Sequence, residues 1–190
     1  MKMKNQLSKL ALVAALLATP LVQAATYVID TKGAHAAVAF KFKHLNISWL
    51  TGEFEDFDGQ FTYDEANPKA STIEVNVRTA SIDSNHAERD KHMRSAKFLD
   101  TDQFPSAEFA SKRVEVGADG ALTVVGDLTL HGVTKEVAID AEMTGAGDDP
   151  WGGYRAGFEG SVTIDTTEFG MKFPPSNEVE LLFFLEGIRQ

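Results

Sequence analysis

The side chains best equipped for chemistry gather in one short segment, comprising His86, Glu88, Arg89, Asp90, His92 and Arg94. Imidazole and carboxylate groups are common general acids and bases, and arginines bind anions. One interpretation is therefore an enzyme that acts on a lipid or small hydrophobic substrate through His86, Asp90 and His92. The other interpretation, which we favour, is a solvated helix face with Glu88–His92 and Asp90–Arg94 pairs four residues apart.

The five histidines do not form a metal-binding pattern. On a helix, His86 and His92 would lie about 120° apart around the axis, whereas zinc ligands on one helix are three or four residues apart. His35 and His44 are nine residues apart on one predicted strand, so they point to opposite faces. His131 lies in a predicted turn. We therefore expect neither a metal nor a cofactor.

A second polar cluster is Asp148-Asp149-Pro150-Trp151-Gly152-Gly153. Two carboxylates could contribute to a calcium site, but a calcium loop needs more oxygen ligands at alternating spacing. We interpret the cluster as a turn whose Trp151 closes one end of the fold. The sequence contains no nucleophile elbow, phosphate loop or dinucleotide fingerprint, and so we predict no catalytic residue.

The start of the chain has the pattern of an export signal. Three lysines precede an apolar run at residues 10–17, and Val22-Gln23-Ala24 suits a signal peptidase. We predict that residues 1–24 are removed, leaving one domain at 25–190. With no Cys in the sequence, there is no site for a disulfide or for a lipidated Cys. We expect a soluble protein of the bacterial periplasm, not a lipoprotein.

The charge of the chain excludes one class of partner. The net charge is −10, and loss of the three signal lysines makes it −13. Such a chain is repelled by phosphate backbones and by anionic lipid surfaces, so nucleic acid is not an expected partner. The 13 Phe residues are many for so acidic a protein. Their rings must be buried, either in a core or around a ligand.

Period-two alternation of apolar side chains predicts eight or nine strands, among them 36–44, 57–63, 73–77, 122–130, 137–143 and 179–185. A phase slip between Phe109 and Val114 indicates a bulge, and Gly59 indicates a bulge or bend. Regularly spaced antiparallel strands are typical of a barrel or sandwich. We favour a closed barrel because closure leaves no edge strand.

One helix is expected at about 83–96, capped by Asp83 or Ser84 and packed against the barrel. The last strand is apolar on both faces, since Leu182, Phe184 and Ile188 alternate with the inward residues. Something must cover its outer face: the helix, a loop, or the second subunit of a homodimer. We favour the helix or a loop.

Small residues lie in phase with the large inward ones, for example Gly126 beside Leu128 and Gly160 beside Phe158. This pattern has two explanations. The small residues let large ones interdigitate in a solid core, or they leave room for a ligand in the barrel. The pattern alone does not choose between them.

Several segments, in order along the mature chain, resemble the YceI family of periplasmic polyisoprenoid-binding proteins. They are Asn85–His92 with Phe98-Leu99 and Phe104-Pro105, Gly126–Lys135, His35–His44, Gly52–Gly59 and Gly147–Gly153. The resemblance implies an extended lipocalin-like antiparallel barrel with one helix. It also implies a hydrophobic tunnel for a long isoprenoid chain, no established catalytic activity or metal, and homodimers among relatives.

The expected ligand is thus a long-chain isoprenoid lipid that the protein sequesters or carries, with transient membrane contact during exchange. We predict that its tail contacts the inward side chains of Phe40, Phe42, Phe61, Val75, Val77, Phe109, Leu128 and Phe158. For the mouth of the barrel or a polar head group, we predict Trp49, Trp151, Arg89 and Arg94.

Overall fold

The structure is a computed structural model that describes residues 24–118, 120–173 and 176–190, so the predicted signal lies outside it except for Ala24. The strands are β1 (Ala25–Ile29), β2 (Ala37–His44), β3 (Ser48–Phe54), β4 (Phe57–Tyr63), β5 (Thr72–Arg78), β6 (Ile82–Asp83), β7 (Ser106–Val116), β8 (Leu122–Leu130), β9 (Val133–Asp148), β10 (Tyr154–Asp165) and β11 (Glu178–Arg189). The helices are α1 (Ala87–Arg94) and three 3-10 turns, η1 (Pro68–Ala70), η2 (Thr79–Ser81) and η3 (Thr166–Phe169).

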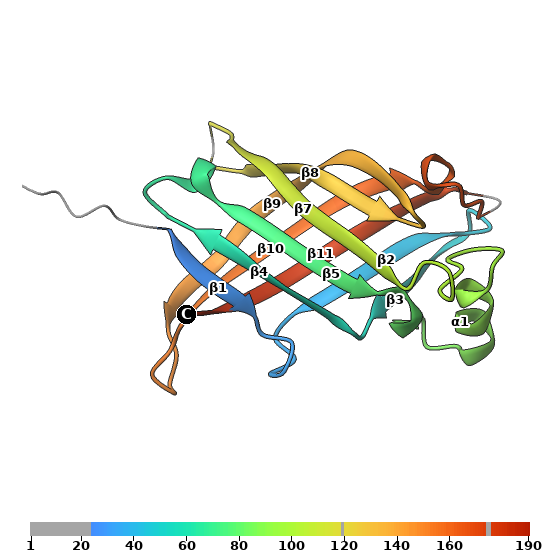
Figure 1. The fold of residues 1–190 in the computed structure, drawn as a ribbon, viewed down its shortest axis with the longest axis horizontal. Helices are drawn as coiled ribbons and strands as arrows, with labels where there is room; N and C mark the ends of the chain where they lie inside the picture. Colours follow the sequence, from blue (N-terminus) through green and yellow to red (C-terminus); the bar gives the residue numbers. More distant parts are fainter. Residues whose placement is uncertain (1–23, 119, 174–175) are drawn as a thin grey trace, which may run out of the picture.

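The strands form one closed antiparallel barrel (Figure 1). Most strands pair with their neighbours in the chain, and β11 closes the sheet by pairing with β1 at its end and with β2 along its first half. The prediction of an all-β barrel with one helix is therefore confirmed. Closure satisfies the backbone groups that an open sheet would leave exposed at its edges.

The eleven strands make a barrel of eight, because three of the eight paths around the barrel are interrupted and each is counted as two strands. β1 and β2 both run antiparallel to β11 and follow one path around the loop at 30–36. β3 and β4 likewise form one path, pairing with β2 and β1 respectively. β5 and β6 form the third, opposite β4 and β3. The bulge or bend predicted at Gly59 is not found there, because β4 pairs with β5 in unbroken register through Gly59. The chain is interrupted instead at 55–56, between β3 and β4.

Bulges lie within the long strands. The β7–β8 register shifts between Ser111 and Arg113, which confirms the slip expected in this strand. The β9–β10 register shifts at Gly157/Phe158 and leaves Thr144 without a counterpart, a bulge that the sequence did not reveal. Bulges increase local twist and bend long strands, as a closed barrel requires.

The helix is shorter than predicted and its cap differs. α1 spans Ala87–Arg94, and its N-cap is His86, whose Nδ1 accepts the backbone N–H of Arg89 at 3.2 Å. The predicted caps Asp83 and Ser84 are wrong, because Asn85 at φ 61° turns the chain before the helix begins. Of the described residues, none belongs to a helix that is long and apolar enough to cross a membrane.

The outer face of β11 is not covered by the helix. α1 packs against β6, at the end of the barrel shown at the right in Figure 1. The side chain of Phe184, which faces outward from β11, is about half exposed. The prediction that the helix covers this face is wrong, whereas the loop and the homodimer stay predictions.

Candidate functional site

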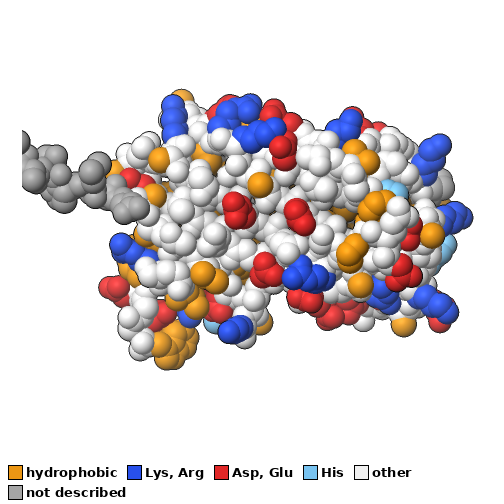
Figure 2. All heavy atoms as spheres, viewed as in Figure 1, with side chains coloured by type: hydrophobic (Ala, Val, Ile, Leu, Met, Phe, Trp, Pro, Cys, Tyr) orange, Lys and Arg blue, Asp and Glu red, His pale blue; other side chains and the backbone are white. Residues whose placement is uncertain are grey.

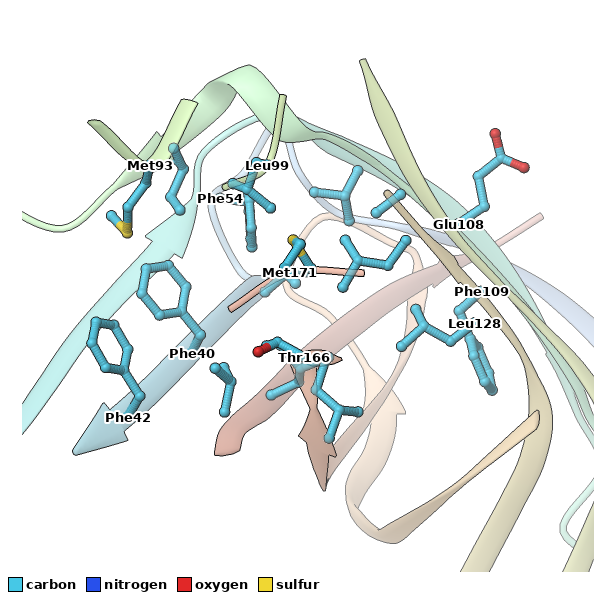
Figure 3. A pocket seen from close by; sticks show the side chains of 18 of the residues that line it. Phe40, Phe42, Phe54, Met93, Leu99, Glu108, Phe109, Leu128, Thr166 and Met171 are labelled. Atoms are coloured by element: carbon cyan, nitrogen blue, oxygen red, sulfur yellow. The ribbon is translucent and has the colours of Figure 1, made fainter. Parts of the chain in front are cut away.

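The barrel interior contains two apolar cavities. Cavity 1 lies toward α1 and has a volume of about 100 Å3. Figure 3 shows the rings of Phe40 and Phe42 on β2 facing this space, with Met93 of α1 and Leu99 on another side. The side chain of Glu108 points away from it. The cavity therefore offers apolar contacts from strands and from the helix.

Cavity 2 occupies the half of the barrel near the β4–β5 hairpin and has a volume of about 80 Å3. Three side chains line both cavities, namely Val75 on β5, Phe109 on β7 and Phe183 on β11. We call these three residues the waist. Each volume is smaller than the range of about 300–1,000 Å3 that is typical of small-molecule pockets.

All eight residues predicted to contact a lipid tail line one of the two cavities. Cavity 1 contains Phe40, Phe42, Val77 and Leu128, cavity 2 contains Phe61 and Phe158, and both contain Val75 and Phe109. The structure thus brings them together along one interior. Their contact with a ligand stays a prediction.

Glycines explain how a barrel with so many aromatic rings keeps its interior open. A Cβ atom at Gly52 would lie 2.4 Å from Cζ of Phe40, and one at Gly126 would lie 2.7 Å from Cζ of Phe109. Each ring therefore reaches the bare backbone of the adjacent strand and lies along the wall of the barrel. Interdigitation at the wall and room along the axis occur together, so the two explanations of the pattern are not exclusive.

Sequence reasoning missed the residues that close cavity 1 at the α1 end, including Met93, Leu99, Met171 and Phe173. The ring of Phe173, which follows η3, lies 4.7 Å from that of Phe98, which follows α1. These residues lie outside the strands and show no period-two pattern. The only signal in the sequence is their apolar character within polar segments.

The polar residues of α1 attach it to the barrel. The buried Asp90 accepts hydrogen bonds from the backbone N–H of Ser84 at 3.0 Å and from the Ser84 hydroxyl. Burial alone would raise the pKa of Asp90, but these bonds and the charge of Arg94 bring it below its ordinary value. Arg89 Nε donates to Ser84 Oγ at 2.7 Å, and Arg94 donates to the carbonyl of Ile82 at 3.0 Å.

These contacts separate the residues of the enzyme interpretation. His86 caps α1, Asp90 binds Ser84, and the His92 ring packs edge-on against Phe98 at 4.7 Å. Within the described residues, no hydrogen bond joins the three side chains to one another. The predicted Glu88–His92 and Asp90–Arg94 ion pairs are also not formed there. Neither Arg89 nor Arg94 is among the residues that line cavity 1 or cavity 2.

The two tryptophans lie outside both cavities. Trp151, in the β9–β10 turn, is 76% exposed and stacks over Arg155 at 5.4 Å. The prediction that it closes one end of the barrel is therefore wrong. Trp49 on β3 is half exposed, with Lys43 Nζ 4.0 Å from the ring centroid.

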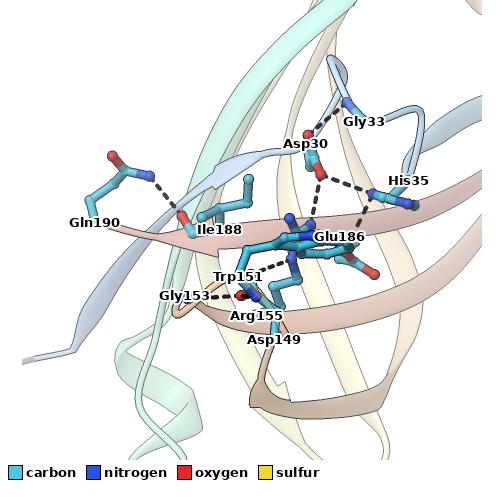
Figure 4. A network of polar contacts seen from close by, with 10 residues as sticks. All are labelled: Asp30, Gly33, His35, Asp149, Trp151, Gly153, Arg155, Glu186, Ile188 and Gln190. Atoms are coloured by element: carbon cyan, nitrogen blue, oxygen red, sulfur yellow. Dashed lines mark hydrogen bonds and ion pairs between the residues drawn. The ribbon is translucent and has the colours of Figure 1, made fainter.

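Arg155 of β10 is the centre of a polar network at the opposite end from α1 (Figure 4). Its guanidinium contacts Asp30 at 2.6 Å, Glu186 at 2.6 Å and Asp149 at 2.8 Å. His35 Nδ1, which lies before β2 and not on it as predicted, is 2.9 Å from Asp30. Hydrogen bonds from Arg155 and then His35 hold the pKa of Asp30 well below its usual range.

This network also bears on metal binding. The ligand atoms of Asp30, His35 and Glu186 lie close enough together for one ion. However, Nη1 of Arg155 contacts both carboxylates, so the guanidinium already supplies the positive charge that a cation would bring. We interpret the cluster as a structural ion-pair network that ties β1 and β11 to β10.

The chain is similar to known proteins of one family in both sequence and fold. Residues 27–186 match the model of the YceI-like domain. The chain is 53% identical to a UPF0312 protein of Pseudomonas aeruginosa, over 99% of this chain and 100% of that one. Its fold is similar to that of BcnA from Burkholderia cenocepacia, with TM-score 0.73 and 22% identity over 83% of this chain and 98% of BcnA. It is also similar to a polyisoprenoid-binding domain from Saccharophagus degradans, with TM-score 0.62 and 14% identity over 88% of this chain and 100% of that domain.

Proposed function

Because this chain belongs to the YceI-like family, we propose that it is an exported lipid-binding protein that holds the tail of a long-chain polyisoprenoid in its barrel. The observation that carries the proposal is the pair of apolar cavities that share the waist residues Val75, Phe109 and Phe183. A tail that passed the waist would occupy both halves of the barrel. The polyisoprenoid-binding domain of similar fold supports this choice of ligand class.

The length of the barrel suits an extended ligand. β11 has 12 residues, which at about 3.3 Å per residue span about 40 Å. Few polar side chains reach the cavities, and the walls of both are dominated by aliphatic and aromatic groups. Such a lining recognises hydrocarbon length and flexibility more than a pattern of hydrogen bonds.

The energetics suit a carrier. Removing a tail of roughly 40 carbons from water gains tens of kcal/mol at about 0.8 kcal/mol per methylene. A bilayer gives the tail the same shelter, so the free energy of transfer between bilayer and barrel is only a small difference between large terms. A small difference permits both loading and release.

The proposal of export, with the periplasm as destination, rests on the signal pattern in residues 1–24. β1 begins at Ala25, directly after the predicted cleavage position. Fractionation of cells that express the full chain, with sizing of the mature protein by mass spectrometry, tests this part. A mature form that retains the first 24 residues would contradict it.

The ligand is tested by extracting purified protein with organic solvent and analysing the extract by mass spectrometry. We expect a long-chain isoprenoid in the extract, and we expect the delipidated protein to take up added isoprenoid. Absence of lipid together with no uptake would remove the carrier function.

Two adjacent residues provide a matched pair of variants. Phe183 lines both cavities, whereas Phe184 faces outward from the same strand. Phe183→Gln places an amide at the waist and is expected to weaken isoprenoid binding at least tenfold. Phe184→Gln is expected to bind as the unchanged protein does. Equal binding by both variants would contradict a tail inside the barrel.

A further inference from the structure

The hairpin between β2 and β3 exposes an unusual set of apolar side chains at the end of the barrel that carries α1 (Figure 1). Ile47 is 81% exposed and Leu45 is 57% exposed, and the ring of Trp49 is half exposed on the outer face of β3. We call the segment 41–52 the hairpin tip. Exposed apolar side chains that cluster in this way mark an interaction surface.

The backbone of the hairpin tip makes Leu45 a costly choice. The turn closes with the Ile47 N–H donating to the His44 carbonyl at 2.9 Å. Its two central residues, Leu45 and Asn46, have φ of 52° and 58°. Such a two-residue turn favours Asn, Asp or Gly at both positions. A branched apolar residue at the first position gains nothing within the fold, since its side chain lies largely in solvent.

The charge of the hairpin tip differs from that of the whole chain. Residues 41–52 contain Lys41, Lys43 and His44 but no Asp or Glu, in a protein with a net charge of −10. Lys41 pairs with Glu180 at 2.8 Å, whereas Lys43 stacks on Trp49 and has no ion pair among the described residues. Basic side chains also lie along the edge of the molecule at the α1 end (Figure 2).

The repulsion expected between an acidic chain and an anionic surface therefore depends on orientation. The 12 residues of β11 span about 40 Å along the strand, and a strand tilt of about 35–45° makes the barrel about 30 Å long. Charges farther apart than about 10 Å are largely screened at 0.1 M salt. In an end-on approach, the hairpin tip meets the surface while the carboxylates at the opposite end of the barrel, such as those around Arg155, stay beyond this distance. Aromatic and basic residues beside apolar ones are typical of groups that sit at a bilayer interface.

The position of the hairpin tip links it to the interior. Phe42, which pairs with Leu50 across the hairpin, lines cavity 1. Phe173, which contacts Phe98, borders the same cavity from another loop. A bilayer that received Leu45 and Ile47 would therefore lie beside the end of cavity 1.

From these observations we propose that the hairpin tip is a docking element for the surface of an anionic phospholipid bilayer, inserting Leu45, Ile47 and Trp49 between head groups. This inference rests on the proposed lipid-carrier function, since it identifies where a tail enters or leaves. The insertion is shallow and reversible because the contact consists of three side chains and Lys43, which has no ion pair among the described residues.

The two tryptophans allow an internal control. Trp151→Phe leaves Trp49 as the only reporter, and Trp49→Phe leaves Trp151, which lies at the opposite end of the barrel. Each protein is mixed with phosphatidylglycerol vesicles that carry brominated acyl chains. We expect strong quenching and a blue shift of Trp49 and neither change for Trp151. Absence of quenching in both proteins, or equal quenching in both, would overturn the proposal.

A second variant separates docking from folding. Leu45→Asn with Ile47→Thr replaces the apolar tip, and Asn suits the positive φ at position 45. We expect affinity for the vesicles to fall at least tenfold while the melting temperature is unchanged or higher. If affinity is unchanged, the hairpin tip is not the docking element. If the unaltered chain is a dimer without lipid and the variant is a monomer, the tip instead binds a second copy and the proposal is wrong.

The same variant tests membrane docking by the hairpin tip separately from lipid binding in the barrel. Delipidated variant is offered isoprenoid from ethanol solution without vesicles. Uptake equal to that of the unaltered chain, with slower exchange to vesicles, supports docking by the tip. If neither protein takes up isoprenoid but Trp49 is still quenched, the carrier function fails and the docking stands.

Discussion

The hollow interior makes a testable prediction about two buried phenylalanines. Phe109 is 6% exposed and lines both cavities, whereas Phe169 is 1% exposed and lines neither. Both belong to the interior at or near the α1 half. In a solid core, Phe→Ala would cost the same at each position. In a hollow one, Phe109→Ala costs less than Phe169→Ala.

The expected size of the difference follows from the cavity left behind. Phe→Ala in a packed site costs about 3–5 kcal/mol, which includes about 24 cal/mol for each Å3 of new void. A lost phenyl ring leaves roughly 100 Å3, or about 2 kcal/mol. At Phe109 the ring borders a cavity on one side, so fewer packing contacts are lost with it and the cost is smaller. We expect about 4 kcal/mol for Phe169→Ala and about 2 kcal/mol for Phe109→Ala.

The assay is urea denaturation of delipidated protein, followed by far-UV circular dichroism. Delipidation matters because a bound ligand stabilises the folded state by mass action and would fill the space at Phe109. Equal slopes of free energy against urea for both variants show that the same surface unfolds. If the two substitutions cost the same within about 0.5 kcal/mol, the interior is packed and the argument for a lipid tail loses its basis.

Three further predictions concern the polar network, the barrel wall and the helix. Arg155 and His35 lower the folded-state pKa of Asp30, so this carboxylate stabilises the fold above about pH 4, and the stabilisation is lost as the pH falls below that value. Asp30→Asn should therefore flatten the fall in melting temperature between pH 5 and pH 2.5. An unchanged profile of melting temperature against pH would contradict this. Gly126→Ala puts a Cβ 2.4 Å from the carbonyl oxygen of Ala110 and should lower the unfolding free energy by about 1–3 kcal/mol in urea titrations, whereas Gly145→Ala, with no atom within 4 Å, should have little effect. Asp90→Ala leaves the buried Ser84 without its acceptor and should cost about 1–3 kcal/mol, with faster amide exchange in α1; unchanged exchange would show that the helix is held by other contacts.

The strands and their inward faces could be predicted because their signal is local. Residues two apart on a strand share a face, so Phe40 and Phe42 face the interior in any register that buries that side. The slip between Phe109 and Val114 identified the bulge for the same reason. The number of strands was less certain. Three interrupted strands make eleven segments from eight paths, and the positions of the interruptions depend on loops.

The two ends of the barrel were harder to predict because the side chains there lie in loops and the helix, outside the strand pattern. Asp90 was interpreted as a surface residue or a catalytic acid, yet it is buried against Ser84. Trp151 was expected to close the barrel, but Arg155 holds its ring outside. The wall of cavity 1 includes Met93, Leu99 and Phe173, although no period-two pattern in the sequence indicates them.

The amino-acid sequence alone determined the alternation that makes a closed barrel, the residues on its inner surface and the acidic character of the chain. The tertiary structure alone decided that Phe40 and Phe109 lie against glycines of adjacent strands and leave two cavities, and that Asp30, Asp149 and Glu186 meet at Arg155. The physical reason is range. Side-chain direction along a strand follows from the nearest few residues, whereas empty space and shared charges depend on strands that closure of the sheet brings together.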